Sequence, residues 1–191
     1  EAAEVARALP ALSVGLHVDL CEWDYGPEGW QPVYERVGEG RNDIEAEVIR
    51  QLDRFRELFG RDPTHLDSHQ HVHRHEPARS VLAMLGGQLG VPVRDFTPDV
   101  AYRGDFYGQT GHGEPAPEAI ELDSLVRLVA ALPEGVSEVG CHPAVVPESA
   151  SSYAVERVTE LQVLCDPRVQ HAIAAAGIEL RSFAGLTSAR T

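Results

Sequence analysis

The segment Ser13 to Leu20 reads SVGLHVDL, and it sets the pattern on which the rest of the chain is interpreted. Its apolar residues occupy every second position, and the polar residues His17 and Asp19 fall between them. Alternation with a period of two is typical of a β-strand that buries one face. We therefore expect a strand here, with His17 on its polar side.

Outward from this strand, short apolar runs alternate with longer helical patterns. Residues 42–59 repeat apolar side chains at helical spacing, and Gly60 follows as a stop. Residues 21–41 and 97–118, rich in Gly and Pro, are interpreted as long loops. Further helices are expected at 1–9, 77–90, 123–132, 153–164 and 167–176, and further strands at 64–73, 91–96, 136–141 and 178–183. This order predicts an α/β fold, a parallel sheet or a (β/α) barrel, with its chemistry at the carboxyl ends of strands.

The bulk composition narrows the classes of function. The chain has 191 residues, which suits one domain, and 43% of them are hydrophobic. A formal charge of -14 disfavours nucleic acid and anionic membrane surfaces as partners. The sequence has no apolar run of about 20 residues, the length that a membrane span needs. Three widely spaced cysteines are not a disulfide framework, so reduced thiols and a cytoplasmic location are expected.

The block Thr64 to His73, THLDSHQHVH, carries the strongest chemical signal. Five ionisable residues occupy alternate positions in it: His65, Asp67, His69, His71 and His73. On a strand they would share one face, which favours metal binding or catalysis over a polar face that only hydrogen-bonds and stacks. One or at most two of these histidines could bind the same ion, and the others would support the ligands or contact substrate.

Two further histidines gain meaning beside this block. His17 alone would be interpreted as a core histidine, but together with the block it becomes a candidate metal ligand. His142 follows a predicted strand and precedes Pro143, where it could donate a proton to a leaving group or be a turn residue without a role. Arg157 and Glu160, three apart on a predicted helix, are expected to form an exposed pair.

These residues resemble a known family. LSVGLHVDL and the later LDRFRELFGRDPTHLDSHQHVH closely resemble the YdjC-like carbohydrate deacetylases, a family that includes chitooligosaccharide deacetylases. Further matches follow in the family's order: VPVR at 91–94, FYG at 106–108, EVGCHPA at 138–144 and Y…R..EL..L at 153–164.

The resemblance implies a distorted (β/α) barrel that removes N-acetyl groups from amino sugars or short oligosaccharides. It implies one divalent ion, Zn or Mg, held by an Asp and two His, which fall on His17 and His69. The family's Asp belongs to an amino-terminal NADDFG strand that this sequence does not contain, and the sequence begins with Glu1. We therefore expect residues 1–191 to form a single domain whose amino-terminal part, with the first barrel strands, is missing.

The remaining roles follow from the chemistry of amide hydrolysis. His142 is the candidate general acid, and Asp67 or Asp19 would replace the missing carboxylate base. Residues expected to contact a small carbohydrate substrate, with loop packing as the alternative, are Arg94, Tyr107, His71 and Trp23. Two other functions stay open: a related hydrolase acting on another amide or a phosphoester, and a degenerate sugar-binding relative without turnover. A homodimer is also left open.

Overall fold

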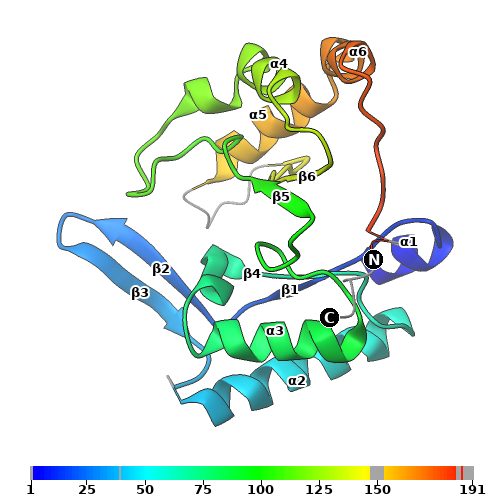
Figure 1. Cartoon of the computed structure of the whole chain (residues 1–191). Helices are drawn as coiled ribbons and strands as arrows, with labels where there is room; N and C mark the ends of the chain where they lie inside the picture. Colours follow the sequence, from blue (N-terminus) through cyan, green and yellow to red (C-terminus); the bar gives the residue numbers. More distant parts are fainter. Residues whose placement is uncertain (1, 39, 147–152, 184–185, 187–191) are drawn as a thin grey trace. The chain divides into compact units, whose positions relative to one another are not determined.

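The computed structural model describes residues 2–38, 40–146, 153–183 and 186, and it has a mixed α/β fold with small parallel sheets (Figure 1). The chain divides into two compact units. The first unit comprises Glu1–Pro98 together with Arg181–Thr191, and the second comprises residues 99–180. Within the described residues, no helix is long and apolar enough to cross a membrane.

The first unit is built on the parallel pair of strands β1 (Leu16–Val18) and β4 (Leu66–Ser68). Their register sets His17 directly opposite Asp67. Leu66 also forms a parallel bridge to Val93, which brings a third extended segment beside β4. The strand expected at residues 13–20 is confirmed in this shorter form, while residues 91–96 contribute only the bridge.

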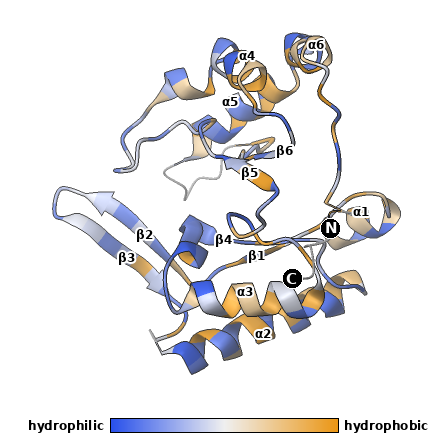
Figure 2. Ribbon diagram, in the orientation of Figure 1, coloured by the Kyte–Doolittle hydropathy of each residue, from blue (hydrophilic) through white to orange (hydrophobic). Residues whose placement is uncertain are grey.

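Two helices cover this pair of strands, as Figure 1 shows. Helix α2 (Arg41–Phe59) ends at Gly60 and helix α3 (Ala78–Leu89) ends at Gly90, and both glycines have the left-handed conformation that a helix stop requires. In Figure 2, hydrophobic and hydrophilic residues alternate along both helices. Their apolar residues join one core with the strands: Leu16, Val18, Ile44, Val48, Leu52, Phe55, Leu66, Val81, Leu82, Leu85 and Val93. Burying each Leu, Val or Phe of this kind contributes roughly 1.5–3 kcal/mol. A short helix, α1 (Ala2–Ala8), precedes β1.

The strand predicted for residues 64–73 is wrong over most of its length. Only β4 is extended, and it is followed at once by a 3-10 helical segment, η1 (His69–Arg74). Inside η1, Gln70 and His71 have φ values of 47° and 54°, in the left-handed region that non-glycine residues rarely adopt. The backbone turns sharply there, so the alternating histidines do not share one face.

The long loop predicted for residues 21–41 is also wrong. Strands β2 (Cys21–Gly26) and β3 (Gly29–Glu35) form an antiparallel hairpin, with Pro27 and Glu28 at its tip and Gly29 at a φ of 87°. Figure 1 shows the hairpin as an arm that extends away from α2 and α3. Its base is fixed on β1, because Asp19 accepts hydrogen bonds from the Tyr34 hydroxyl at 3.0 Å and from Arg36 at 2.7 Å.

The second unit contains a parallel pair, β5 (Val100–Arg103) and β6 (Val136–Val139), with a short 3-10 segment, η2 (Pro117–Ile120). Its helices match the predicted ranges: α4 (Leu122–Ala130), α5 (Ala154–Leu164) and α6 (Pro167–Ala175). Strand β5 lies inside the predicted loop at 97–118, and the strand predicted at 178–183 does not form. Helices α4 and α6 pack around Phe106, Ile120, Leu125 and Val169.

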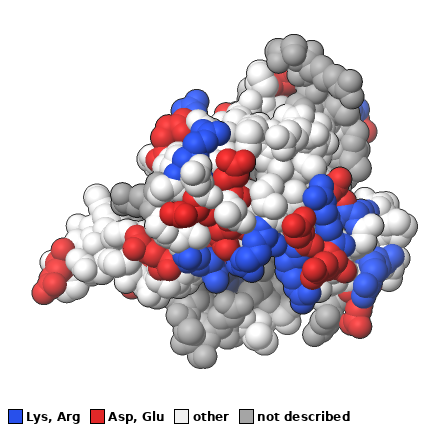
Figure 3. Space-filling model, turned by 90° about the horizontal axis from the view of Figure 1, so that it is seen from below, with Lys and Arg blue, Asp and Glu red and all other residues white. Residues whose placement is uncertain are grey.

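Acidic and basic side chains are interspersed on the face that Figure 3 shows. Exposed ion pairs along and beside α2 include Arg54 with Glu57 at 2.8 Å and Arg56 with Asp62 at 2.6 Å. Exposed pairs of this kind contribute only about 0–1 kcal/mol each. The charged surface therefore does little to explain why the first unit folds.

Candidate functional site

The structure brings the two predicted metal ligands together. His17 lies in β1, and His69 follows the last residue of β4, at the same end of the parallel pair. Their ring centroids are 5.7 Å apart, with the ring planes inclined at 75°. Two imidazoles that bind one ion through nitrogens about 2 Å from it have centroids roughly 5 Å apart. The centroid distance between His17 and His69 is therefore close to that of two imidazoles that share one ion.

Asp67 and Arg94 support this pair from the neighbouring strand positions. The His17 Nδ1 atom donates to Asp67 Oδ1 at 2.9 Å, and Arg94 Nη1 lies 2.7 Å from Asp67 Oδ2. The arrangement follows from the parallel register, since the Arg94 backbone N–H donates to the Leu66 carbonyl at 3.0 Å. A carboxylate that holds one ring nitrogen of a histidine leaves the other nitrogen to face a metal.

The pKa of Asp67 lies below its ordinary value. Burial raises the pKa of this carboxyl, but the hydrogen bond from His17 and the positive charge of Arg94 outweigh that effect. Asp67 is therefore an anion with both oxygens engaged. That arrangement suits the orientation of His17 better than the transfer of a proton from water.

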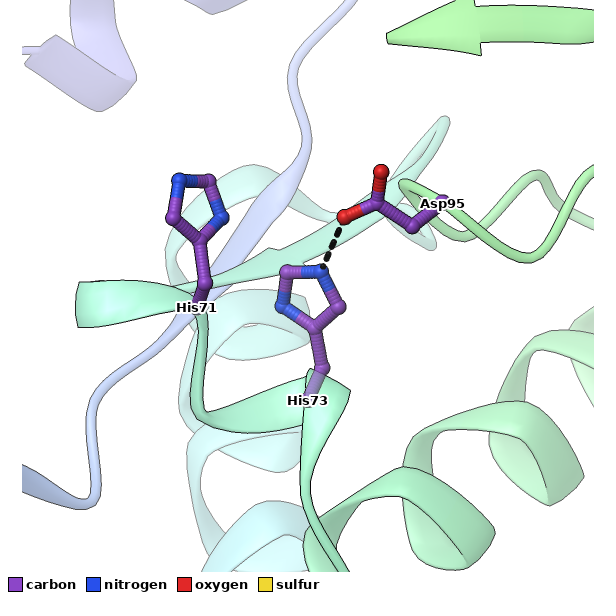
Figure 4. Close-up of side chains that lie close together, drawn as sticks. All are labelled: His71, His73 and Asp95. Carbon is purple, nitrogen blue, oxygen red and sulfur yellow. Dashed lines mark hydrogen bonds and ion pairs between the residues drawn. The ribbon is translucent and has the colours of Figure 1, made fainter. Parts of the chain in front are cut away.

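A second group of potential ligands lies farther along the same turn. Donor atoms of His71, His73 and Asp95 all lie within 4.8 Å of one another, so this group could hold a metal ion. Figure 4 shows His73 joined to Asp95, with His71 on the preceding turn. His73 is fully buried, and its ring nitrogens lie 2.6 Å from Ser68 Oγ and 3.2 Å from Asp95 Oδ2. An ion would have to displace one of these bonds to bind His73.

Charges around the second group also oppose a cation. Asp95 accepts a hydrogen bond from Arg74 at 2.8 Å, and this bond and the one from His73 hold the pKa of Asp95 below its ordinary value despite burial. Burial and the charges of Arg74 and Arg94 lower the pKa of His71 to about 4. His71 is thus neutral at physiological pH, and the two nearby guanidinium groups repel any metal cation that would bind there. The charge of Arg94 acts near both groups, since Arg94 also pairs with Asp67 beside His17.

His65, predicted on the same face as the other histidines, has a structural role instead. Its ring stacks on Phe183 with centroids 3.9 Å apart, and Thr64 Oγ1 lies 3.0 Å from its Nδ1. Burial lowers the pKa of His65. The ring passes so close to Gly15 that a Cβ there would lie 2.4 Å from His65 Nε2. Glycine before His17 is therefore a packing requirement.

His142 lies in the second unit, just beyond β6, and its side chain is exposed. The ring lies 5.1 Å from Tyr107, which in turn stacks on Tyr153 at 4.4 Å. The predicted sugar contact Tyr107 thus takes part in an aromatic cluster around His142. The cluster positions the side chain without enclosing it.

Glu160 holds this aromatic cluster in place, a role that the sequence did not predict. Its side chain is fully buried and accepts hydrogen bonds from the Tyr153 hydroxyl and from the backbone N–H of His142. Burial raises the pKa of Glu160. The exposed pair predicted for Arg157 and Glu160 is therefore wrong. The family motif Y…R..EL..L could have indicated this contact, because it contains both Tyr153 and Glu160.

The remaining predicted contact, Trp23, lies in β2 beside η1 (His69–Arg74), which is called the histidine turn below. The Gln70 side chain accepts from the Trp23 backbone N–H at 2.9 Å and donates to the Trp23 carbonyl at 2.6 Å. This amide reproduces the pairing that a neighbouring strand would offer. Sequence reasoning missed Gln70, since nothing near it in the chain indicates a partner 47 residues away.

The chain is similar to known proteins over most of its length. A family described as YdjC-like protein matches residues 1–175. A carbohydrate deacetylase of Geobacillus stearothermophilus is 33% identical over 95% of this chain and 79% of its own length. A chitooligosaccharide deacetylase of Citrobacter koseri is 33% identical over 95% of this chain and 81% of its own length.

One solved structure shares the fold. It is the crystal structure of an Enterococcus faecalis protein described as a candidate for cellobiose-phosphate cleavage, and it superposes with a TM-score of 0.73. The two chains are 23% identical, and the match covers 97% of this chain and 82% of the other. At that identity the likeness concerns the fold alone.

Proposed function

The chain belongs to the YdjC-like protein family, and on that premise we propose that it is a metal-dependent hydrolase that removes N-acetyl groups from amino sugars or short oligosaccharides. The names of its relatives support this activity, because they are carbohydrate and chitooligosaccharide deacetylases. The observation that carries the proposal is the distance of 5.7 Å between the ring centroids of His17 and His69. Asp67 accepts a hydrogen bond from the Nδ1 atom of His17.

The donor set fits one divalent ion, Zn or Mg, which we place at His17 and His69. Catalytic sites of this kind have three protein ligands, and these residues provide two of them. When bound, the ion would act as a Lewis acid on the amide carbonyl and lower the pKa of water. Asp67 holds the ring of His17 in place, and Arg94 balances the charge of Asp67. Among the roles considered for Asp67, the geometry supports orientation more than that of a base.

His142 is the proposed general acid. Hydrolysis of an N-acetyl group breaks the bond between the carbonyl carbon and the nitrogen, and the departing amine must gain a proton. An exposed imidazole can donate such a proton to a leaving group. Glu160 holds the backbone at His142, so the position of the ring does not depend on the loop alone.

The wider predictions remain part of the proposal. We propose that residues 1–191 belong to one domain with a distorted (β/α) barrel, to which the two small parallel sheets would contribute strands. Arg94, Tyr107, His71 and Trp23 are the proposed contacts to the carbohydrate. The proposed location is cytoplasmic.

The test is direct measurement of acetate release. Purified protein is treated with a chelator, supplied with Zn or Mg, and incubated with N-acetylglucosamine and its β-1,4-linked oligomers. We expect release of acetate that depends on the added metal, because the ion activates the carbonyl and the water together. Tight metal binding without acetate release from any of these sugars would instead support the non-catalytic sugar-binding alternative.

A further inference from the structure

The β2–β3 hairpin presents a row of ring-bearing side chains on one face. Residues that oppose each other across an antiparallel pair share a face, and every second residue along a strand returns to it. The register pairs Tyr25 with Trp30 and Trp23 with Pro32. A register shift next to Trp23 pairs Tyr34 with Glu22, so Tyr34 lies on the other face of the hairpin. The aromatic face therefore consists of Trp23, Tyr25, Trp30 and Pro32.

This aromatic face is open to solvent at its tip. Trp30 is 47% exposed and Tyr25 is 40% exposed, and their rings meet edge to face with centroids 5.3 Å apart. The opposite face of the hairpin carries Asp24 and Gln31. Large aromatic side chains gathered on a projecting ribbon do not stabilise a core, and exposed patches of this kind mark recognition sites.

The charge of the hairpin selects among possible ligands. Residues 21–35 contain four carboxylates and no Arg or Lys, and the acids are Glu22, Asp24, Glu28 and Glu35. The tip of the arm in Figure 3 accordingly shows red and white atoms. Arg36, which follows, is bound by Asp19 at 2.7 Å. Two of these acids lie near the aromatic face: Glu35, which is paired with Cys21 on that face, and Glu28 at the hairpin tip. Carboxylates beside aromatic rings favour a ligand with apolar ring faces and positive charge, since ammonium groups are attracted to both.

The aromatic face is also tied to the histidine turn. Gln70, which lies between His69 and His71, holds both backbone polar groups of Trp23. Its φ of 47° is in the left-handed region, and the two hydrogen bonds to Trp23 help to hold it there. The hairpin and the candidate metal centre thus keep a fixed relation through one side chain.

From these observations we propose that the aromatic face binds the sugar units of an amino-sugar oligosaccharide next to the unit being deacetylated, and that it prefers units that already carry a free amine. This inference rests on the proposed function and deepens it. Loss of an acetyl group turns a neutral amide into an ammonium group, which the acidic hairpin attracts. The protein would then favour chains that are already partly deacetylated over free monosaccharides.

Calorimetric titration of the full chain tests the proposal. The ligands are β-1,4-linked tetramers of glucosamine and of N-acetylglucosamine, with the two monosaccharides for comparison. Trp30→Ala should weaken tetramer binding about tenfold, the loss expected for one stacked ring. Gln31→Ala is the matched control, because Gln31 is exposed and pairs with Asp24 on the opposite face of the hairpin, and it should bind like the unchanged protein.

A second variant isolates the charge. Glu28→Gln combined with Glu35→Gln should remove the preference for the glucosamine tetramer and leave binding of the acetylated tetramer. The preference should also weaken as salt is added, because these carboxylates are exposed. Equal tetramer affinity in the unchanged protein and in Trp30→Ala overturns the proposal.

The aromatic face could instead bind a second copy of this chain, and sedimentation measurements test that alternative. A dimer that Trp30→Ala converts to monomer, together with no tetramer binding, would assign the face to self-association and overturn the proposal. Acetate release is scored separately. Tetramer binding through Trp30 without any release would refute the hydrolase, whereas release without a role for Trp30 would refute only the hairpin site.

Discussion

In the first unit, the carboxylates of Asp67 and Asp95 are each bound by an arginine and a histidine, whereas in the second unit the buried Glu160 accepts hydrogen bonds from the neutral donors of Tyr153 and His142. The pKa of each paired aspartate is lowered, and that of Glu160 is raised by burial. Burial acts in the same direction on all three groups. The opposite outcomes therefore follow from the partners.

The difference indicates that the carboxylates of the two units have different roles. Charged pairs around His17 keep the imidazole in one orientation, which is what a metal ligand requires. A buried acid bound by neutral donors holds the backbone at His142 in a fixed place. Variants in the first unit should therefore change metal binding, and variants in the second should change rate or pH dependence.

The largest effect is expected for His69→Ala. Removing a proposed ligand should lower metal affinity by more than the roughly 100-fold that loss of a supporting residue can cause. Elemental analysis of purified protein should find the metal lost, and acetate release should fall with it. Asp95→Asn is the comparison, since it alters the second group and leaves the His17–His69 pair intact. Metal retained in His69→Ala but lost in Asp95→Asn would move the centre to His71, His73 and Asp95.

His142→Gln should lower the deacetylation rate by about 10²- to 10⁴-fold, the usual contribution of a general acid. Metal content should stay at the level of the unchanged protein. The hydrogen bond to Glu160 uses the backbone N–H, so the substitution leaves it in place. Loss of metal from this variant would show that His142 acts as a ligand and not as the acid.

Asp67→Asn should weaken metal binding by about 10- to 100-fold, because the amide no longer fixes the ring of His17 as an anion does. Titration with Zn against a competing chelator measures this change. Asp62→Asn serves as the control, since Asp62 forms only an exposed pair with Arg56. Unchanged affinity in Asp67→Asn would leave the orienting role without support.

The smallest effect should appear in the pH dependence of stability of Glu160→Gln. The folded-state pKa of Glu160 is raised above its ordinary value of 4.5, so its contribution to stability is fully present below that value. The contribution is lost as the pH rises through the folded-state pKa, and glutamine has no such titration. Melting temperatures measured from about pH 4 to pH 8 should fall more steeply for the unchanged protein than for the variant. Parallel curves would contradict the raised pKa.

The sequence by itself determined the elements that depend on local pattern. Alternating apolar residues located β1, helical spacing located α2, and Gly60 marked its end because glycine adopts the left-handed stop at little cost. The family resemblance singled out His17 and His69, whose ring centroids lie 5.7 Å apart in the structure. The family motifs, in their order along the chain, pointed to the same chemistry.

Only the tertiary structure decided how the polar side chains are used. Strand alternation stops applying where Gln70 and His71 leave the extended region, so the histidines of one block separate. His69 lies beside His17, His65 packs on Phe183, and His71 and His73 lie near Asp95. Glu160 looks like any exposed helical acid until Tyr153 and His142 close over it. Period and composition describe one segment at a time, whereas hydrogen bonds such as that between Gln70 and Trp23 join residues far apart in the chain. For the buried Glu160, burial itself demands such partners, since a polar group removed from water must find one.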